Sequence, residues 1–153
     1  EHNLTLALHP SETELRLMAR VIAFILNAND DLAFCKGISE DDEPDLWEKD
    51  LDGSIKLWID LGQPDEKRIK KACGRSNRVI IYTYQENMAE PWFKQIQNNI
   101  NRFKNLSIIH LNIEESIENF AKRSMVLQCN ISDEELTLIN DNEDLIITHK
   151  KWN

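Results

Sequence analysis

Two aspartates of this chain stand where a carboxylate needs a partner. Asp45 follows Pro44 in an acidic segment, and Asp60 interrupts the apolar run of residues 55–61. A carboxylate inside an apolar strand costs free energy unless it is paired or binds a metal. Two carboxylates that converge at a strand end suit Mg²⁺, with Mn²⁺ as a substitute, because this ion prefers hard oxygen ligands and keeps several waters. Such an ion can orient and acidify a water for attack on a phosphodiester.

A helix predicted directly after Gly62 adds a feature of the opposite charge. Pro64 is expected at its first position, and acids follow in its first turn. The densest cluster of basic side chains in the chain falls in this helix, within residues 66–71. Because a helix N-terminus presents unpaired N–H groups, it can hold an anion together with such basic side chains.

A parallel sheet is the element that would bring these groups together. Apolar side chains at nearly every position of residues 55–61 predict a strand buried on both faces, which ends at Gly62. The alternation of strand and helix that follows is typical of a parallel sheet with right-handed crossovers. Its predicted elements are strands at 55–61, 78–84 and 106–111 and helices at 63–74 and 89–101. Ligands bind at the C-terminal ends of such strands, so Asp60 is expected at the functional edge.

The other predicted segments place a helix first and antiparallel strands last. Ser11 and Glu14 have capping-box spacing, with Ser11 as the N-cap, and apolar residues follow at helical spacing. The further elements are a strand at 4–8, a helix at 11–29, a strand at 32–35, an acidic loop at 39–44, a helix at 113–122 and antiparallel strands over 125–147. Because no linker or repeat interrupts this order, we expect residues 1–153 to form a single domain.

The composition restricts the class of protein. A formal net charge of −9 argues against a protein that mainly coats nucleic acid, because phosphate contacts need clustered Lys and Arg. It still permits an enzyme with local basic residues. No apolar run approaches the roughly 18 residues of a membrane span and no signal peptide is present, so we expect a cytoplasmic protein without a membrane partner. The three cysteines are expected to be reduced, buried thiols and not zinc ligands.

Several segments carry a family resemblance over essentially the whole chain. They are His9-Pro10-Ser11-Glu12-Thr13, Asp42-Glu43-Pro44-Asp45-Leu46-Trp47, the run from Trp58 to Glu66, and Lys70-Lys71-Ala72-Cys73. These segments resemble the YaeQ family, small bacterial proteins with a variant PD-(D/E)XK nuclease fold. The resemblance implies a restriction-endonuclease-like αβββαβ core, with a mixed central sheet flanked by helices. It also implies that an N-terminal strand segment is missing from this sequence, which begins with Glu1 and not with Met.

The resemblance also implies roles for individual residues. Pro44-Asp45 matches the proline-aspartate of the motif, and Asp60 matches its second acid. Both would bind Mg²⁺, with Glu12 as a further metal ligand on the first helix.

One position departs from the motif. Its lysine should stand two residues after Asp60, where this chain has Gly62. Gln63 would take the role of that lysine if the strand bulges there. Alternatively, a lysine reaches in from the next helix, and Lys70 is the better placed one because it flanks the stripe of apolar residues that the helix is expected to bury.

Simpler explanations stand beside these roles. Asp60 can pair with a neighbouring arginine, Asp45 can be a turn residue, and Glu12 can complement a helix dipole. Two functions therefore stay open: a Mg²⁺-dependent nuclease or phosphodiesterase, and an inactive nuclease fold that binds a nucleic acid or a protein partner. Gly62 and the acidic balance favour the second. A flavodoxin-like or Rossmann-like ligand binder is disfavoured, because no glycine-rich loop follows a strand.

Overall fold

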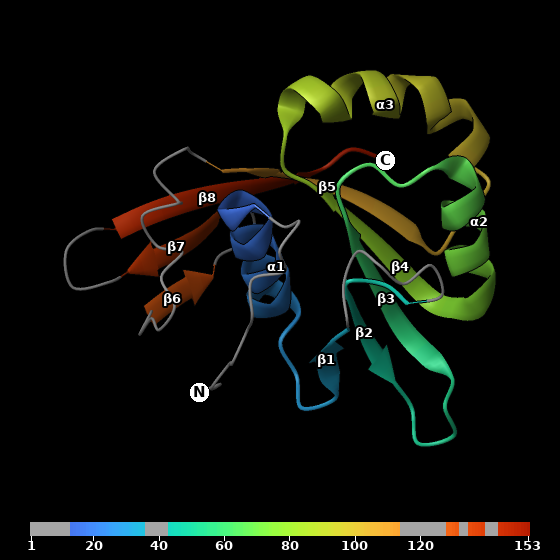
Figure 1. Ribbon diagram of the computed structural model, residues 1–153, viewed down its shortest axis with the longest axis horizontal. Coiled ribbons are helices and arrows are strands. Elements are labelled where there is room, and N and C mark those ends of the chain that lie inside the picture. The colour runs from blue at the N-terminus through green and yellow to red at the C-terminus, as the bar shows by residue number, and fades with distance from the viewer. Residues whose placement is uncertain (1–12, 36–42, 114–127, 132–134, 140–143) are drawn as a thin grey trace.

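A mixed β-sheet forms the centre of the protein (Figure 1). The computed structural model describes residues 13–35, 43–113, 128–131, 135–139 and 144–153. Within them, eight strands are hydrogen-bonded in the order β1-β2-β3-β4-β5-β8-β7-β6. The strands are β1 (Leu32–Phe34), β2 (Leu46–Lys49), β3 (Ile55–Leu61), β4 (Ser76–Thr83), β5 (Leu106–Asn112), β6 (Gln128–Ile131), β7 (Glu135–Ile139) and β8 (Asp144–Lys151). The helices are α1 (Glu14–Asn27), α2 (Glu66–Arg75) and α3 (Glu86–Ile100).

The centre of the sheet is parallel and its flanks are antiparallel. β3, β4 and β5 pair in parallel, and α2 and α3 connect them. β1 and β2 add to one side, and β8, β7 and β6 add to the other, all in antiparallel pairs. The predicted parallel core, the antiparallel tail and the mixed character of the sheet are confirmed.

Each face of the sheet has its own core. On one face, α1 packs through Met18 and Ile22 against side chains such as Leu57 and Ile59 of β3. On the other face, α2 and α3 pack through residues such as Ile69 and Ile96 around Trp58, Ile81 and Ile108. Figure 1 shows α2 and α3 together, away from α1. A central strand is therefore covered on both faces, which explains the almost continuous apolar run of β3.

The helix ends differ from the predicted ones. α1 begins at Glu14 with Thr13 as its N-cap, since the Thr13 hydroxyl accepts the Arg16 N–H at 3.1 Å, so the prediction of Ser11 as cap is wrong. α2 is capped by Asp65, whose carboxylate accepts the Arg68 N–H at 2.8 Å; Pro64 therefore precedes the cap and is not the first helical residue. Both caps are short polar side chains that satisfy an otherwise unpaired N–H.

α3 begins three residues earlier than predicted, at Glu86, and contains Pro91 in its interior. Backbone N–H groups of Met88 and Ala89 already bond to the Gln85 carbonyl, at 3.0 and 2.9 Å. Proline is normally tolerated only in the first turn of a helix, because it lacks the N–H that later positions need. α3 accommodates Pro91 beyond its first turn and packs against the sheet through Ile96 and Ile100.

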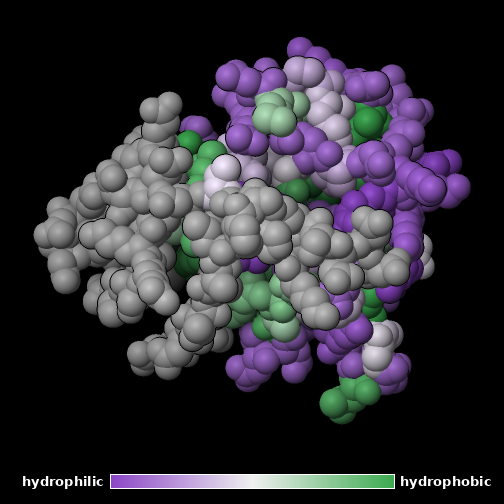
Figure 2. Space-filling model, viewed as in Figure 1, coloured by the Kyte–Doolittle hydropathy of each residue, from purple (hydrophilic) through white to green (hydrophobic). Residues whose placement is uncertain are grey.

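Some predicted features lie outside the described residues. They are the strand at 4–8, most of the acidic loop at 39–44, the helix at 113–122, the turn at 140–142 and the side chain of Glu12. Among the described helices, none combines the length and the apolar character that crossing a membrane requires. Figure 2 shows a predominantly hydrophilic surface over α2 and α3.

Candidate functional site at the end of β3

The two predicted acids meet at the C-terminal end of β3. Asp45 immediately precedes β2, and its backbone N–H donates to the carbonyl of Ile59 on β3 at 3.0 Å. Its side chain reaches two residues further along the same strand, where Oδ2 accepts the Leu61 N–H at 2.8 Å. Asp60 lies between these two contacts. Both carboxylates are almost completely buried, with residue exposures of 5% for Asp45 and 3% for Asp60.

Arg16 of α1 neutralises Asp45. Its Nη2 lies 2.8 Å from Asp45 Oδ1, so both oxygens of this carboxylate accept an N–H. Burial raises the pKa of Asp45 above its usual value; Arg16 and the Leu61 N–H oppose the rise, and the nearby charge of Asp60 adds to it. Burial also lowers the pKa of Arg16, but Asp45 and Tyr84 outweigh that effect and leave its pKa raised. Each partner compensates part of the desolvation of the other.

Arg68 of α2 neutralises Asp60 in a bidentate pair. Nε lies 2.9 Å from Oδ2 and Nη2 lies 3.1 Å from Oδ1. Nη2 also donates to the backbone carbonyl of Glu43 at 2.8 Å, which ties the segment before Asp45 to α2. The Arg68 guanidinium lies 5.6 Å from the centre of the Trp58 ring. This planar fork fits a carboxylate in a way that a lysine ammonium cannot.

A positive backbone φ favours glycine at position 62, where the family resemblance led us to expect a lysine. Gly62 has φ of 88°, and its N–H donates to the Tyr82 carbonyl at 2.9 Å. Although the space beside it is open, this conformation is strained for any residue with a side chain. The turn that ends β3 therefore disfavours a lysine at this position.

Gln63 presents an unpaired donor beside the acids. Its Nε2 is buried and has no hydrogen-bond partner among the residues that the structure describes. A buried donor without an acceptor costs about 1–3 kcal/mol, which makes an acceptor from outside the chain favourable. Gln63 belongs to a pocket of about 240 Å³ lined by Arg16, Asp45, Asp60, Leu61, Gln63, Pro64 and Arg68.

Comparison with known proteins identifies the family. The family model described as YaeQ protein matches residues 1–149. The chain belongs to the YaeQ family. The Escherichia coli (strain K12) protein called uncharacterized protein YaeQ is 41% identical over 152 residues, which cover 98% of this chain and 84% of that protein. The Salmonella typhi protein of the same name is 40% identical, over 97% of this chain and 83% of that one.

Solved YaeQ structures share the fold. The crystal structure of YaeQ protein from Xanthomonas axonopodis pv. citri superposes with a TM-score of 0.94 at 43% identity, and covers 98% of this chain and 86% of that one. The crystal structure of YaeQ protein from Pseudomonas syringae has a TM-score of 0.88 at 31% identity, and covers 97% and 83% of the two chains. The predicted family resemblance is thus confirmed.

The structure brings together three of the five predicted site residues of this YaeQ-family chain. Asp45, Asp60 and Gln63 line one pocket. Lys70 is exposed on α2 and is not among the residues that line it. Glu12 lies outside the described residues.

Two arginines that the sequence did not single out complete the site. A basic residue does reach in from α2, but it is Arg68, because the N-terminus of α2 is the part of that helix nearest to the end of β3. Its signal was weak: Arg68 adjoins buried Ile69 and stands one turn before buried Ala72. No local sequence pattern identified Arg16 as a site residue, because its contact with Asp45 joins segments 29 residues apart in the chain.

The pocket of this YaeQ-family protein, as it is arranged, does not fit Mg²⁺. All four carboxylate oxygens accept N–H groups, and two guanidinium charges already balance the two acids. A divalent cation would lie beside both arginines, and Gln63 Nε2, the unpaired buried atom among the described residues that line the pocket, is a donor and not a ligand. Over the described ranges, no group of three or more His, Cys, Asp or Glu side chains is placed to hold a metal ion.

The described thiols, Cys35 and Cys73, are poor nucleophiles because their pKa values are raised. Burial, with added repulsion from Glu43 and Asp45, raises the pKa of Cys35 to about 12. Burial alone raises the pKa of Cys73 to about 11. Both are free cysteines with raised pKa values; Cys73 is buried as predicted, whereas Cys35 is only half-buried.

Proposed function

We propose that this YaeQ-family protein binds a phosphate group of a nucleic-acid strand in the pocket at the end of β3, and does not cleave the strand. The observation that carries the proposal is the polarity of the pocket. Its acceptors are occupied, since both carboxylates are held by Arg16 and Arg68. Its unpaired buried group is a donor, Gln63 Nε2. Guanidinium and amide N–H groups are suited to phosphate oxygens.

We further propose that the pocket belongs to a restriction-endonuclease-like core. From α1 to β4, the elements follow the order α, β, β, β, α, β that such a core has. Asp45 and Asp60 stand at the corresponding positions of its motif. In this proposal the acids no longer hold a metal; they orient the two arginines, whose charges would otherwise be buried without a partner.

The charge of the chain limits how it can bind. With a net charge of −9, long-range attraction to a polyanion is absent, and only the phosphates that enter the pocket contribute. We therefore expect weak binding of short single strands with a shallow salt dependence. For one or two neutralised phosphates, the slope of log K against log salt is about −0.7 to −1.4.

Binding of a labelled oligonucleotide tests the proposal. Fluorescence anisotropy is measured with single-stranded DNA and RNA of about 12 nucleotides at low salt. The variant Asp60→Asn with Arg68→Gln removes both charges of the pair and leaves no unpaired buried carboxylate. We expect it to bind the oligonucleotide about tenfold or more weakly than the natural chain does. A change of this size corresponds to the loss of one charge-assisted hydrogen bond.

The matched control is Lys67→Ala, an exposed basic residue on the same helix. It should leave binding almost unchanged. Equal affinities of the natural chain and the double variant would show that the pocket does not bind the strand, and the proposal would then be abandoned.

A metal-dependent phosphodiesterase is the second candidate, because the two carboxylates do converge. It would use Asp45 and Asp60 for Mg²⁺ and requires both arginines to leave them. Lys70 or Gln63 would then take the role of the motif lysine. Calorimetric titration with Mn²⁺, beside Asp60→Asn, separates the candidates: we expect no saturable binding at millimolar concentrations. Binding by the natural chain that is lost in Asp60→Asn would favour the phosphodiesterase.

A further inference from the structure

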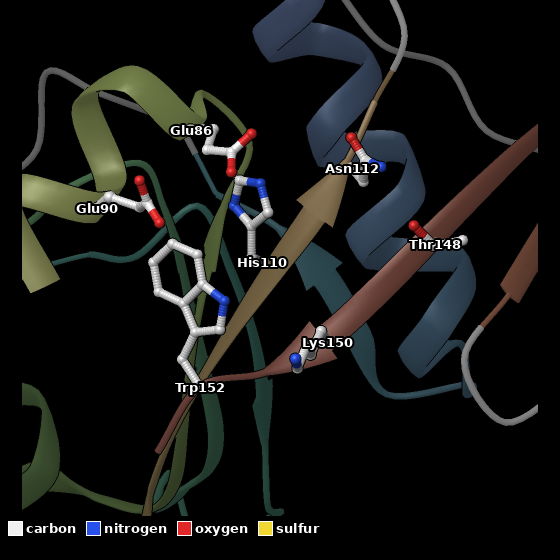
Figure 3. A pocket seen from close by; sticks show the side chains of 7 residues that line it. All are labelled: Glu86, Glu90, His110, Asn112, Thr148, Lys150 and Trp152. Carbon is white, nitrogen blue, oxygen red and sulfur yellow. The ribbon is translucent and has the colours of Figure 1, made fainter.

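A second cavity, of about 350 Å³, lies between α3 and the ends of β5 and β8 (Figure 3). Its floor consists of two cross-strand pairs, His110 opposite Lys150 and Asn112 opposite Thr148. Because alternate residues of a strand point to the same face, these four side chains share one face of the sheet. The volume is at the lower end of the range of small-molecule sites.

The helix side of this cavity is acidic, and aromatic rings adjoin it. Glu86 and Glu90 are one turn apart on α3, so their carboxylates lie on the same side of the helix. Trp152 stacks on His110 with 4.8 Å between ring centres and 14° between planes. Thr83 Oγ1 lies 2.7 Å from His110 Nδ1 and fixes the imidazole. Figure 3 shows the two glutamates on the same side of the cavity as these rings, with Lys150 on β8.

Groups of both charge signs line this cavity, Glu86 and Glu90 on α3 and Lys150 on β8. Within the described part of the chain, neither Glu86 nor Glu90 forms an ion pair with Lys150. Burial lowers the pKa of His110, although both glutamates oppose this, so the imidazole is neutral near pH 7. The cavity therefore has two negative groups on the helix and one positive group on the sheet among the residues that line it.

We propose that this cavity binds a small zwitterion, with its ammonium group at Glu86 and Glu90 and its carboxylate at Lys150. A simple organic cation can pair with the glutamates but leaves Lys150 without a counter-charge, and a simple anion can pair with Lys150 but is repelled by the two glutamates. The His110 and Trp152 rings also line the cavity, and aromatic rings attract an ammonium group. Since the three charged side chains are exposed to solvent, each contributes little and the affinity is expected in the millimolar range. The proposal does not depend on the phosphate pocket.

Three probes of similar size test the charge requirement. They are γ-aminobutyrate, which is a zwitterion, n-butylamine, which carries only the cation, and butyrate, which carries only the anion. Proton–nitrogen NMR spectra of the full chain are recorded during titration with each probe. We expect saturable shifts of the Lys150 amide and the Trp152 indole signals with γ-aminobutyrate, at an affinity about fivefold or more above that for either other probe.

Variants locate the site. Glu86→Gln with Glu90→Gln, and Lys150→Ala, should each abolish the saturable shifts. The controls are Glu66→Gln on α2 and Lys151→Ala, the neighbour of Lys150 on the opposite face of β8; both residues are exposed and neither lines the cavity. All of these are surface changes, so the fold is expected to persist. The proposal is overturned if n-butylamine binds as well as γ-aminobutyrate, if no probe binds, or if the site variants bind like the natural chain.

Discussion

Replacement of Arg68 by alanine is expected to lower the free energy of unfolding by about 3–5 kcal/mol. The change removes both hydrogen bonds to Asp60, whose side chain is only 5% exposed, and leaves a buried carboxylate without its counter-charge. It also frees the Glu43 carbonyl, which links the segment before β2 to α2. Urea denaturation followed by circular dichroism at neutral pH measures the effect. For a domain of this size, a loss of that magnitude is a large part of the total stability.

The double variant Asp60→Asn with Arg68→Gln separates the effect of the charge from that of the shape. It removes both ionic groups and keeps side chains of similar size, so most of the lost stability should return. Lys67→Ala, also on α2 but exposed, is the control for removal of a basic side chain and should change stability by less than about 0.5 kcal/mol. If Arg68→Ala were no more destabilising than this control, the pair would be a surface contact of little energetic weight.

Replacement of Arg16 by alanine is expected to lower the free energy of unfolding, and the loss should grow as the pH rises. Asp45 would keep only the Leu61 N–H as a partner, and its pKa, already raised by burial, would rise further. A folded carboxyl with a raised pKa contributes stability that is fully present below its unfolded value of 3.8 and is lost as the pH rises through the folded value. The deficit of Arg16→Ala should therefore be small near pH 4 and reach about 3 kcal/mol near pH 7.

The effect is measured as the free energy of unfolding at several pH values between about 4 and 7, for the natural chain and for Arg16→Ala. The control compares Arg16→Ala with Asp45→Asn against Asp45→Asn alone; neither chain has the titrating carboxyl, so the difference in unfolding free energy between them should not change with pH. A deficit of Arg16→Ala that is equally large at both ends of the window would mean that packing, and not the charge of Asp45, accounts for the loss.

The two ion pairs explain the mixture of success and failure at the site. A carboxylate in an apolar strand needs a partner, so the burial of Asp60 could be anticipated from residues 55–61 alone. The kind of partner could not. A metal ion and an arginine satisfy the same carboxylate, and the choice depends on which side chain of α2 reaches the end of β3. Arg68 does so, whereas Lys70 is exposed on the same helix.

The sequence by itself determined the features that depend on local chemistry and on the period of apolar side chains. The bounds of β3, the end of that strand at Gly62, the parallel arrangement of β3, β4 and β5 and the buried stripe of α2 all follow from residues close together in the chain. The family also follows from short segments that could be compared directly.

Only the tertiary structure decided the contacts between distant segments. The pairing of Arg16 with Asp45 joins residues 29 positions apart, and the second cavity joins α3 to the end of β8. Local pattern carries no information on such contacts, because they depend on how α1 crosses the sheet and on the pairing of β5 with β8. The sequence thus specified two buried carboxylates at one strand end, and the packing of the helices around the sheet turned that acid pair into a neutral, donor-rich pocket.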